Sequence, residues 1–277
     1  MLPNGLKLGY EIIDTCASEA VASTQLLEWL EKSVQNSTNL SPPLALVIGT
    51  GFSRTTHAIA PFLQQFGIPM IDYGSTSPLL SNKNRYPMYS RTVASDRFMA
   101  QAMAKLASDL GWKCVHLVYS FGQYGENGAE DVAQFLLQNG ICLVGGSPMG
   151  VTIDTKAEHE FESAIEKIDE TPNVRIIVCF CEDTTVRGLL NALISREKAT
   201  LSRRKYFFVA GDFWGKSMDL SNMQSAAEGS ITFQTNEQAG RPLSNAIGKN
   251  SSSLPWWINR LLENGSRSID PWLKGKT

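Results

Sequence analysis

One stretch, residues 44–77, restricts the possible fold more than any other part of the chain. Residues 44–49 form a short apolar run that ends on glycine, as a buried strand of a parallel sheet does. Residues 54–66 carry apolar side chains at a helical spacing, with Pro61 as the weak point, and residues 68–73 form a second apolar run. Together they predict a strand–helix–strand unit with parallel strands and a right-handed crossover.

The two loops that follow these strands carry small hydroxyl side chains. Ser53 follows the first strand and leads into the helix, and Ser75 and Thr76 follow the second strand. Both loops open on one edge of the sheet, where ligands of open α/β sheets bind. Backbone donors and a helix dipole at that edge suit a carboxylate or a phosphate. Helix capping and turn formation explain the same residues equally well.

The same stretch imitates a dinucleotide-binding fingerprint. Gly49 and Gly51 follow a strand, and Asp72 ends the next one. The third glycine of the fingerprint would fall at Arg54, whose side chain would obstruct close packing of helix on strand. A nucleotide-dependent enzyme is therefore a disfavoured alternative. The sequence also has no GxSxG, HExxH or P-loop motif, and its three histidines fall in unrelated elements. We expect no enzyme activity, no metal site and no cofactor.

The rest of the chain alternates between strand and helix patterns, which is typical of an α/β fold with parallel sheets. We expect a partial first lobe in residues 1–95, a second lobe in 96–236, and a truncated return to the first lobe in 237–277. The expected strands are 6–12, 89–93, 112–119, 141–144, 174–180, 206–210 and 228–234, and the expected helices are 18–33, 96–110, 125–138, 157–168, 184–196 and 255–262.

Charge and hydropathy exclude several classes of partner. The formal net charge is −2 over 277 residues, which suggests neither nucleic acid nor an anionic membrane surface. No apolar run approaches the roughly 18–20 residues needed to span a bilayer, and the first residues do not form a signal peptide. Five cysteines and three glycosylation sequons, at Asn36, Asn250 and Asn264, are compatible with an extracellular protein. In that case we expect the chain to begin inside a larger precursor.

Three more polar residues follow predicted strands, namely Asp96, Tyr124 and Asp212. The two acids offer negative charge, and the tyrosine offers an aromatic face for a cation, worth about 0.5–2 kcal/mol. Hydroxyls and amides on one wall with acids and an aromatic ring on the other match the two ends of an amino-acid zwitterion. Taken singly, Asp96 is better explained as a first-turn helix acid and Asp212 as a turn residue.

Cys179 and Cys181 lie on one side of a predicted strand end. Their Cα atoms would be separated by a distance near the upper limit for a disulfide, about 6.8 Å. Two free buried thiols are the alternative, and a metal has no further ligands nearby.

Several stretches together resemble one known family. They are VIGTGFS, IPMIDYGSTSPLLSNKNRY, SRTVASD, AQAMAKLASDLGW, YGENG and VCFCEDTTVRGLL. In this order they resemble the extracellular ligand-binding domain of metabotropic glutamate receptors, which are class C G-protein-coupled receptors, and the last stretch is most similar to the group I subtypes. The resemblance runs from about Leu2 to Trp272. It implies a two-lobed clamshell of the periplasmic-binding-protein type (type I, or Venus flytrap), incomplete at both ends, that closes on an amino acid.

The resemblance also implies roles for individual residues. Ser53, Thr76 and the backbone of Ser75 would hold the α-carboxylate. The α-ammonium would be surrounded by Thr76, Asp96, Tyr124 and Asp212, while Glu126, Glu182 and Asp183 would lie near the cleft. It further implies a Cys179–Cys181 disulfide, a link from Cys16 to a cysteine upstream of Met1, a link from Cys142 to a downstream cysteine-rich domain, and no named partner for Cys114.

The implied partners are those of a receptor: glutamate as the ligand, a homodimer formed through helices 18–33 and 54–66, and a G protein reached through a transmembrane region outside this chain. The implied location is the extracellular face of the plasma membrane. A stand-alone solute-binding protein is an alternative, which the sequons and the Cys179/Cys181 pair disfavour. A class C receptor for another amino acid is a second alternative.

Four residues depart from the family pattern. Gly74 replaces a hydroxyl residue, Phe52 and Phe213 replace small residues, and Asp183 stands where the family has glycine. The resemblance further implies that the basic residues that grip the distal carboxylate of glutamate lie outside this chain. We therefore expect residues 1–277 to bind amino acids weakly or not at all.

Overall fold

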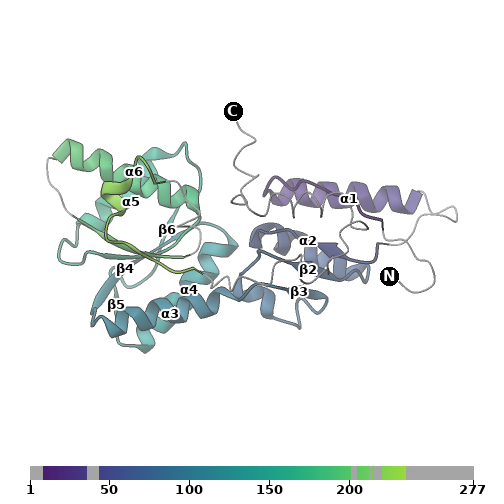
Figure 1. Ribbon diagram of the computed structural model, residues 1–277, viewed down its shortest axis with the longest axis horizontal. Coiled ribbons are helices and arrows are strands. Elements are labelled where there is room, and N and C mark those ends of the chain that lie inside the picture. Colours follow the sequence, from purple (N-terminus) through teal and green to yellow (C-terminus); the bar gives the residue numbers. More distant parts are fainter. Residues whose placement is uncertain (1–8, 36–43, 201–204, 212–213, 215–219, 235–277) are drawn as a thin grey trace, which may run out of the picture. The chain divides into compact units, whose positions relative to one another are not determined.

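The structure is a computed structural model of the chain (Figure 1), and it describes residues 9–35, 44–200, 205–211, 214 and 220–234. These residues belong to one compact unit, Met1–Gln234. Their strands form two separate parallel sheets, so the predicted α/β class is confirmed. None of the described helices is both long and apolar enough to cross a membrane.

The first sheet has three strands in the order β1-β2-β3. All its pairs are parallel, which confirms the predicted strand–helix–strand unit. The helix of that unit begins one residue before its predicted start and continues through Pro61. The elements are α1 (Glu19–Gln35), β1 (Val47–Ile48), α2 (Ser53–Gln65), β2 (Met70–Asp72), the 3-10 helix η2 (Pro78–Ser81) and β3 (Tyr89–Arg91).

The two faces of the first sheet differ in burial. Met70 is fully packed in a cluster with residues of α1 and α2, among them Leu63. Ile48 and Ile71 are register partners on neighbouring strands and point to the other face, where they are 72% and 38% exposed. Within the described residues, the apolar core of this sheet therefore lies on the side of α1 and α2.

The second sheet has six strands in the order β5-β4-β7-β8-β9, with β6 paired to β4. The five strands that we predicted here are present. The sixth, β6, was missed because Gly145, Gly146 and Pro148 beside it are loop signals. The strands are β4 (Cys114–Ser120), β5 (Cys142–Leu143), β6 (Met149–Val151), β7 (Ile176–Phe180), β8 (Phe207–Ala210) and β9 (Ile231–Thr232).

Helices cover both faces of the second sheet. Along β7, Ile177 and Cys179 pack in the cluster of α5 and α6, while Val178 and Phe180 pack in the cluster of α3 and α4. Burial on both faces explains why β7 is a continuous apolar run rather than an alternating one. The helices are α3 (Asp96–Asp109), α4 (Gln123–Gln138), α5 (Glu158–Asp169), α6 (Asp183–Thr200) and the short α7 (Gln224–Ala227).

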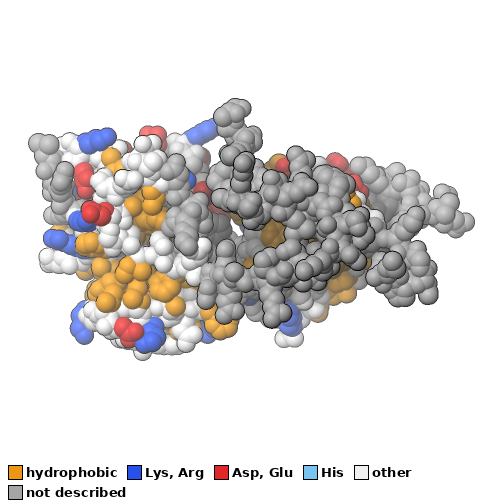
Figure 2. All heavy atoms as spheres, in the orientation of Figure 1, with side chains coloured by type: hydrophobic (Ala, Val, Ile, Leu, Met, Phe, Trp, Pro, Cys, Tyr) orange, Lys and Arg blue, Asp and Glu red, His pale blue; other side chains and the backbone are white. Residues whose placement is uncertain are grey.

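The outer surface of the second sheet's helices carries exposed apolar side chains. Figure 2 shows hydrophobic side chains gathered over α3 and the neighbouring α4. Phe98 is 68% exposed, Leu110 51% and Leu137 59%.

Three further predictions concern the N-terminal strand, the division into lobes and the C-terminal segment. The strand predicted at 6–12 is wrong for residues 9–12, where Tyr10 and Ile12 are 67% and 85% exposed, so the alternating pattern buries no face. The two sheets separate between β3 and β4, on either side of residue 95, but the division into lobes stays a prediction. The helix predicted at 255–262 and the rest of the segment 237–277 lie outside the described residues.

Two disulfides are present among the described cysteines. Cys179 and Cys181 are linked, with their Cα atoms 5.4 Å apart, closer than the sequence led us to expect. Cys114 and Cys142 are linked as well, which corrects the pairing of Cys142 with a downstream domain. The reason is that these two residues are register partners on β4 and β5. Cys16 is exposed and free, and its link to an upstream cysteine stays a prediction.

Candidate functional site

The two loops at the carboxyl edge of the first sheet are held together by Asp72. Its side chain is fully buried at the end of β2. Burial pushes the pKa of this carboxyl upward, but hydrogen bonds, led by that from Thr56, outweigh the burial and leave the pKa below its ordinary value. The donors are the backbone N–H groups of Thr50 at 3.0 Å, Gly51 at 3.4 Å, Gly74 at 2.8 Å and Ser75 at 2.9 Å, and the hydroxyl of Thr56 at 2.6 Å.

This network bears on two expectations from the sequence. The N–H of Ser75, which the resemblance offers to a ligand carboxylate, is used by Asp72, and the Ser75 hydroxyl lies 2.8 Å from Oγ1 of Thr56. Asp72 itself is fully buried and surrounded by donors from the chain, so a ribose hydroxyl has no access to it. The geometry therefore argues against the dinucleotide alternative.

Close packing of the same loops explains the glycine at position 74. A Cβ atom added to Gly74 would lie 2.7 Å from the carbonyl oxygen of Gly51, which is closer than van der Waals contact allows. A hydroxyl residue at this position would push the two loops apart. The departure from the family pattern is thus required by this loop packing.

Ser53 and Thr76 lie in these loops as predicted. Ser53 is the first residue of α2, is 5% exposed, and accepts the N–H of Ser77 at 3.1 Å. The carbonyl of Thr76 accepts the N–H of Asp96 at 3.0 Å, which brings the start of α3 against the loop after β2. The loop after β2 is therefore tied to the hydroxyl of Ser53 through Ser77 and to the backbone of Asp96 through Thr76.

Asp96 and Tyr124 both occupy first helical turns. Asp96 begins α3 directly after Ser95, whose hydroxyl accepts the N–H of Arg97 and caps the helix. Asp96 is 1% exposed and Tyr124 6%. The Tyr124 ring lies against Phe180, with ring centroids 4.9 Å apart. Asp212 and Phe213 lie outside the described residues.

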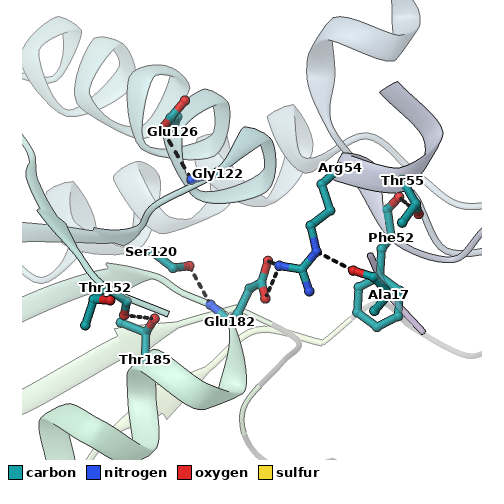
Figure 3. Close-up of polar contacts among 10 residues, drawn as sticks. All are labelled: Ala17, Phe52, Arg54, Thr55, Ser120, Gly122, Glu126, Thr152, Glu182 and Thr185. Carbon is teal, nitrogen blue, oxygen red and sulfur yellow. Dashed lines mark hydrogen bonds and ion pairs between the residues drawn. The ribbon is translucent and has the colours of Figure 1, made fainter. Parts of the chain in front are cut away.

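The carboxyl edge of the second sheet contributes Glu182, which follows β7. Its backbone N–H donates to the Ser120 hydroxyl at 2.8 Å. Its two carboxylate oxygens each lie 3.1 Å from Nη1 of Arg54, whose Nε donates to the carbonyl of Ala17 at 2.9 Å (Figure 3). Burial raises the pKa of Glu182, while Arg54 opposes that rise and Asp183 adds to it.

Arg54 is a functional candidate that the sequence reasoning missed, because it was considered only as an obstacle in a glycine-rich fingerprint. A cation one residue after a hydroxyl in the predicted site loop was the available signal. The remaining acids are placed more openly. Asp183 begins α6 and is exposed, and Glu126 is exposed and accepts the N–H of Gly122 at 3.3 Å (Figure 3).

The residues predicted for the two walls of the site come from different elements. Hydroxyls and a helix start belong to the first sheet, whereas Tyr124, Glu182 and Asp183 belong to elements of the second, and Asp96 starts the helix between the two sheets. A ligand cavity among these residues stays a prediction. The predicted glycosylation sites Asn36, Asn250 and Asn264 lie outside the described residues.

Comparison with known proteins gives one family. The chain matches the family described as receptor family ligand binding region over residues 1–265. It is 30% identical to human metabotropic glutamate receptor 8 over 247 residues, which cover 84% of this chain and 26% of that protein. It is 30% identical to mouse metabotropic glutamate receptor 4 over 285 residues, or 97% of this chain and 29% of that protein.

A fly relative is similar to the same degree. The metabotropic glutamate receptor of Drosophila melanogaster is 29% identical over 248 residues, which cover 83% of this chain and 25% of that protein. The chain therefore spans about a quarter of the length of these curated relatives, which are all metabotropic glutamate receptors. The assignment to the group I subtypes stays a prediction.

Proposed function

The chain belongs to the family described as receptor family ligand binding region. From this premise we propose that the chain is the extracellular amino-acid-binding part of a class C receptor similar to the metabotropic glutamate receptors. L-glutamate is the ligand that the names of the relatives indicate. The chain acts by binding and closing, not by catalysis.

The observation that carries this proposal is the family match over residues 1–265. The two parallel sheets, whose carboxyl ends are followed by the proposed ligand residues, support it. Ser53 and Thr76 supply donors for an α-carboxylate. Asp96 and Tyr124 supply a negative charge and an aromatic ring for an α-ammonium. Ser75, Glu182, Asp183 and, outside the described residues, Asp212 complete the proposed ligand set.

The size of these interactions predicts weak binding by this chain alone. Three or four charge-assisted hydrogen bonds contribute roughly 1.5–3 kcal/mol each. Ordering and association cost at least about 4 kcal/mol. Micromolar affinity requires about 8 kcal/mol net. A site that holds only the zwitterionic head of the ligand is therefore expected to bind in the millimolar range.

The receptor context supplies the remaining parts of the proposal. In this proposal the chain forms a homodimer through α1 and α2, and its two lobes close on the ligand. Closure changes the conformation of a membrane-spanning region outside this chain, and a G protein responds to that change. These statements rest on the family alone.

A related proposal concerns the ligand's side chain. Arg54 is already paired to Glu182 at 3.1 Å, and Asp183 adds an exposed carboxylate next to Glu182. An acidic side chain placed near these groups would meet net negative charge. A neutral or basic amino acid is therefore the second candidate ligand.

Ligand-observed NMR on the 277-residue chain tests both candidates. The probes are L-glutamate, L-glutamine, L-serine, L-lysine, and glutarate, which lacks the α-ammonium group. We expect millimolar binding of the amino acids and no binding of glutarate. Thr76→Val is expected to weaken amino-acid binding several-fold, because it removes a hydroxyl donor.

Asp96→Asn and Asp109→Asn form a matched pair, since both acids lie on α3 and the second is exposed. Only Asp96→Asn should lower amino-acid affinity, and circular dichroism checks that both variants fold. Equal binding of glutarate and glutamate would contradict the zwitterion site. Micromolar binding of glutamate would contradict the expected weakness.

A further inference from the structure

The Arg54–Glu182 ion pair connects the two sheets. Arg54 is the second residue of α2, which follows β1 of the first sheet. Glu182 lies between β7 of the second sheet and α6. The residues are 128 positions apart in the sequence, so the pair closes a long-range contact between the carboxyl-edge loops of both sheets.

Each partner is anchored on its own side. The Arg54 guanidinium donates through Nε to the carbonyl of Ala17 and lies 5.5 Å from the centre of the Phe52 ring. Glu182 is fixed through its N–H by the hydroxyl of Ser120, which is fully buried. Figure 3 shows these contacts extending from Ala17 through Arg54 and Glu182 to Ser120. Anchored side chains lose little further entropy when they pair, which favours the contact.

Solvent reaches this pair poorly. The side chain of Arg54 is 23% exposed and that of Glu182 12%. The exposed pair Lys105–Asp109 within α3 has values of 73% and 59%. Since water and salt screen exposed charges, the Arg54–Glu182 attraction is expected to be considerably stronger than that of Lys105–Asp109.

We propose that the Arg54–Glu182 ion pair is an internal latch that holds the first and second lobes closed in the absence of a ligand. The candidate site residues Ser53, Asp96 and Tyr124 are nearly inaccessible in this arrangement, at 5%, 1% and 6% exposure. In this proposal the balance between open and closed forms is set partly by the chain's own charges, and a bound ligand adds to it.

A second side-chain contact, between α4 and the loop after β2, is weaker. Nδ2 of Asn127 on α4 lies 3.4 Å from Oγ of Ser77, but the same nitrogen is 2.6 Å from the carbonyl of Gln123. Because the shorter bond stays within α4, loss of the Asn127–Ser77 contact alone should change closure little. The ion pair is therefore the contact to remove.

Distances between spin labels, measured by pulsed electron paramagnetic resonance without ligand, test the latch. The labels are placed on the exposed positions Gln65→Cys of α2 and Glu166→Cys of α5 in a Cys16→Ser background. Arg54→Ala and Glu182→Ala are each expected to lower the ratio of closed to open molecules about tenfold, which corresponds to about 1.4 kcal/mol. Lys105→Ala removes the same charge from an exposed pair and should leave the ratio unchanged.

The double variant Arg54→Ala/Glu182→Ala separates a latch from two independent effects. If the residues act through each other, the double variant opens no further than either single variant. Additive opening, or unchanged distances in folded single variants, would overturn the proposal. No amino acid is present in this measurement, so a failure to bind glutamate would count against the proposed function and not against the latch.

Discussion

The two sheets are stabilised in different ways. In the described part of the first sheet, several interior positions are polar, and Thr55, Thr56, Asp72, Ser75 and Ser77 are all fully buried. The second sheet is buried between two apolar clusters that contain Phe180, Leu189 and Phe208. The first sheet thus combines an apolar core with a buried carboxylate and its donors, whereas the second depends mainly on apolar area removed from water.

The edge of the first sheet, which carries Ser53 and Thr76, is therefore held in place by directional hydrogen bonds. Hydrogen bonds to Asp72 fix the loops to within tenths of an ångström, whereas apolar packing tolerates volume-conserving changes. Hydrogen bonds of this kind are needed to position small donor groups such as the hydroxyls of Ser53 and Thr76. Changes at single residues should therefore affect the two sheets separately, and local measurements should resolve them.

The largest expected effect is that of Asp72→Asn. The amide presents donors where Thr50 N–H and the Thr56 hydroxyl already donate, so buried donors lose their acceptor. We expect α2 to lose about 3–5 kcal/mol of protection against amide hydrogen exchange. Asp109→Asn, at an exposed carboxylate, is the control. Equal loss of protection in α2 and α6 would show that the sheets do not differ as described.

Leu189→Ala is the corresponding change in the second sheet. Leu189 is fully buried in the cluster of α5 and α6. Removing its side chain leaves a cavity, and we expect a loss of about 3 kcal/mol. Hydrogen exchange should become faster in α5 and α6 and stay unchanged in α2. Faster exchange in α2 would indicate that the sheets unfold together.

The smallest expected effect is a pH dependence at His57. Burial, with a contribution from Arg85, lowers the pKa of His57 from 6.5 to about 4. The unfolded chain therefore binds a proton that the folded chain does not, so this contribution to stability is full above pH 6.5 and is lost as the pH falls toward 4. Because His57 is only half-buried, solvent screening limits the loss to about 1 kcal/mol.

Hydrogen exchange of α2 between pH 7 and 4, corrected for intrinsic rates, measures this loss. His57→Gln should remove it. His116 on β4 also has a pKa lowered by burial, so β4 should keep its own pH response in that variant. A pH response of α2 that survives His57→Gln would assign the effect to another group.

The sequence predicts the strands of the second sheet more fully than the loop contacts at the carboxyl edge of the first sheet. Runs such as Ile176–Phe180 are apolar because both faces are covered, and local pattern alone reveals them. β6 is different, since its pairing to β4 is a long-range contact within a glycine-rich segment. The sequence does not predict the link between Cys114 and Cys142, because the register of β4 and β5 is not a local property.

The candidate site shows the same limit. Ser53, Thr76 and Asp96 follow from their positions after strands, and the structure joins them. The internal role of Asp72 depends on the closeness of two loops more than twenty residues apart. From the sequence, Asp72 only completes the imitation of a nucleotide-binding fingerprint, an interpretation that is disfavoured there as well. No local sequence pattern predicts that Arg54 pairs with Glu182, which lies 128 positions away.

The placement of the disulfides has a practical consequence for anyone preparing this protein. Both bridges among the described cysteines belong to the second sheet, and the one between Cys179 and Cys181 closes a small ring one residue before Glu182. A reductant would not affect Asp72 and its donors, but it would break the Cys179–Cys181 disulfide and so loosen the segment that carries Glu182, the partner of Arg54. Material secreted by an oxidising host and material made in bacterial cytosol are therefore expected to differ first at the junction of the two sheets.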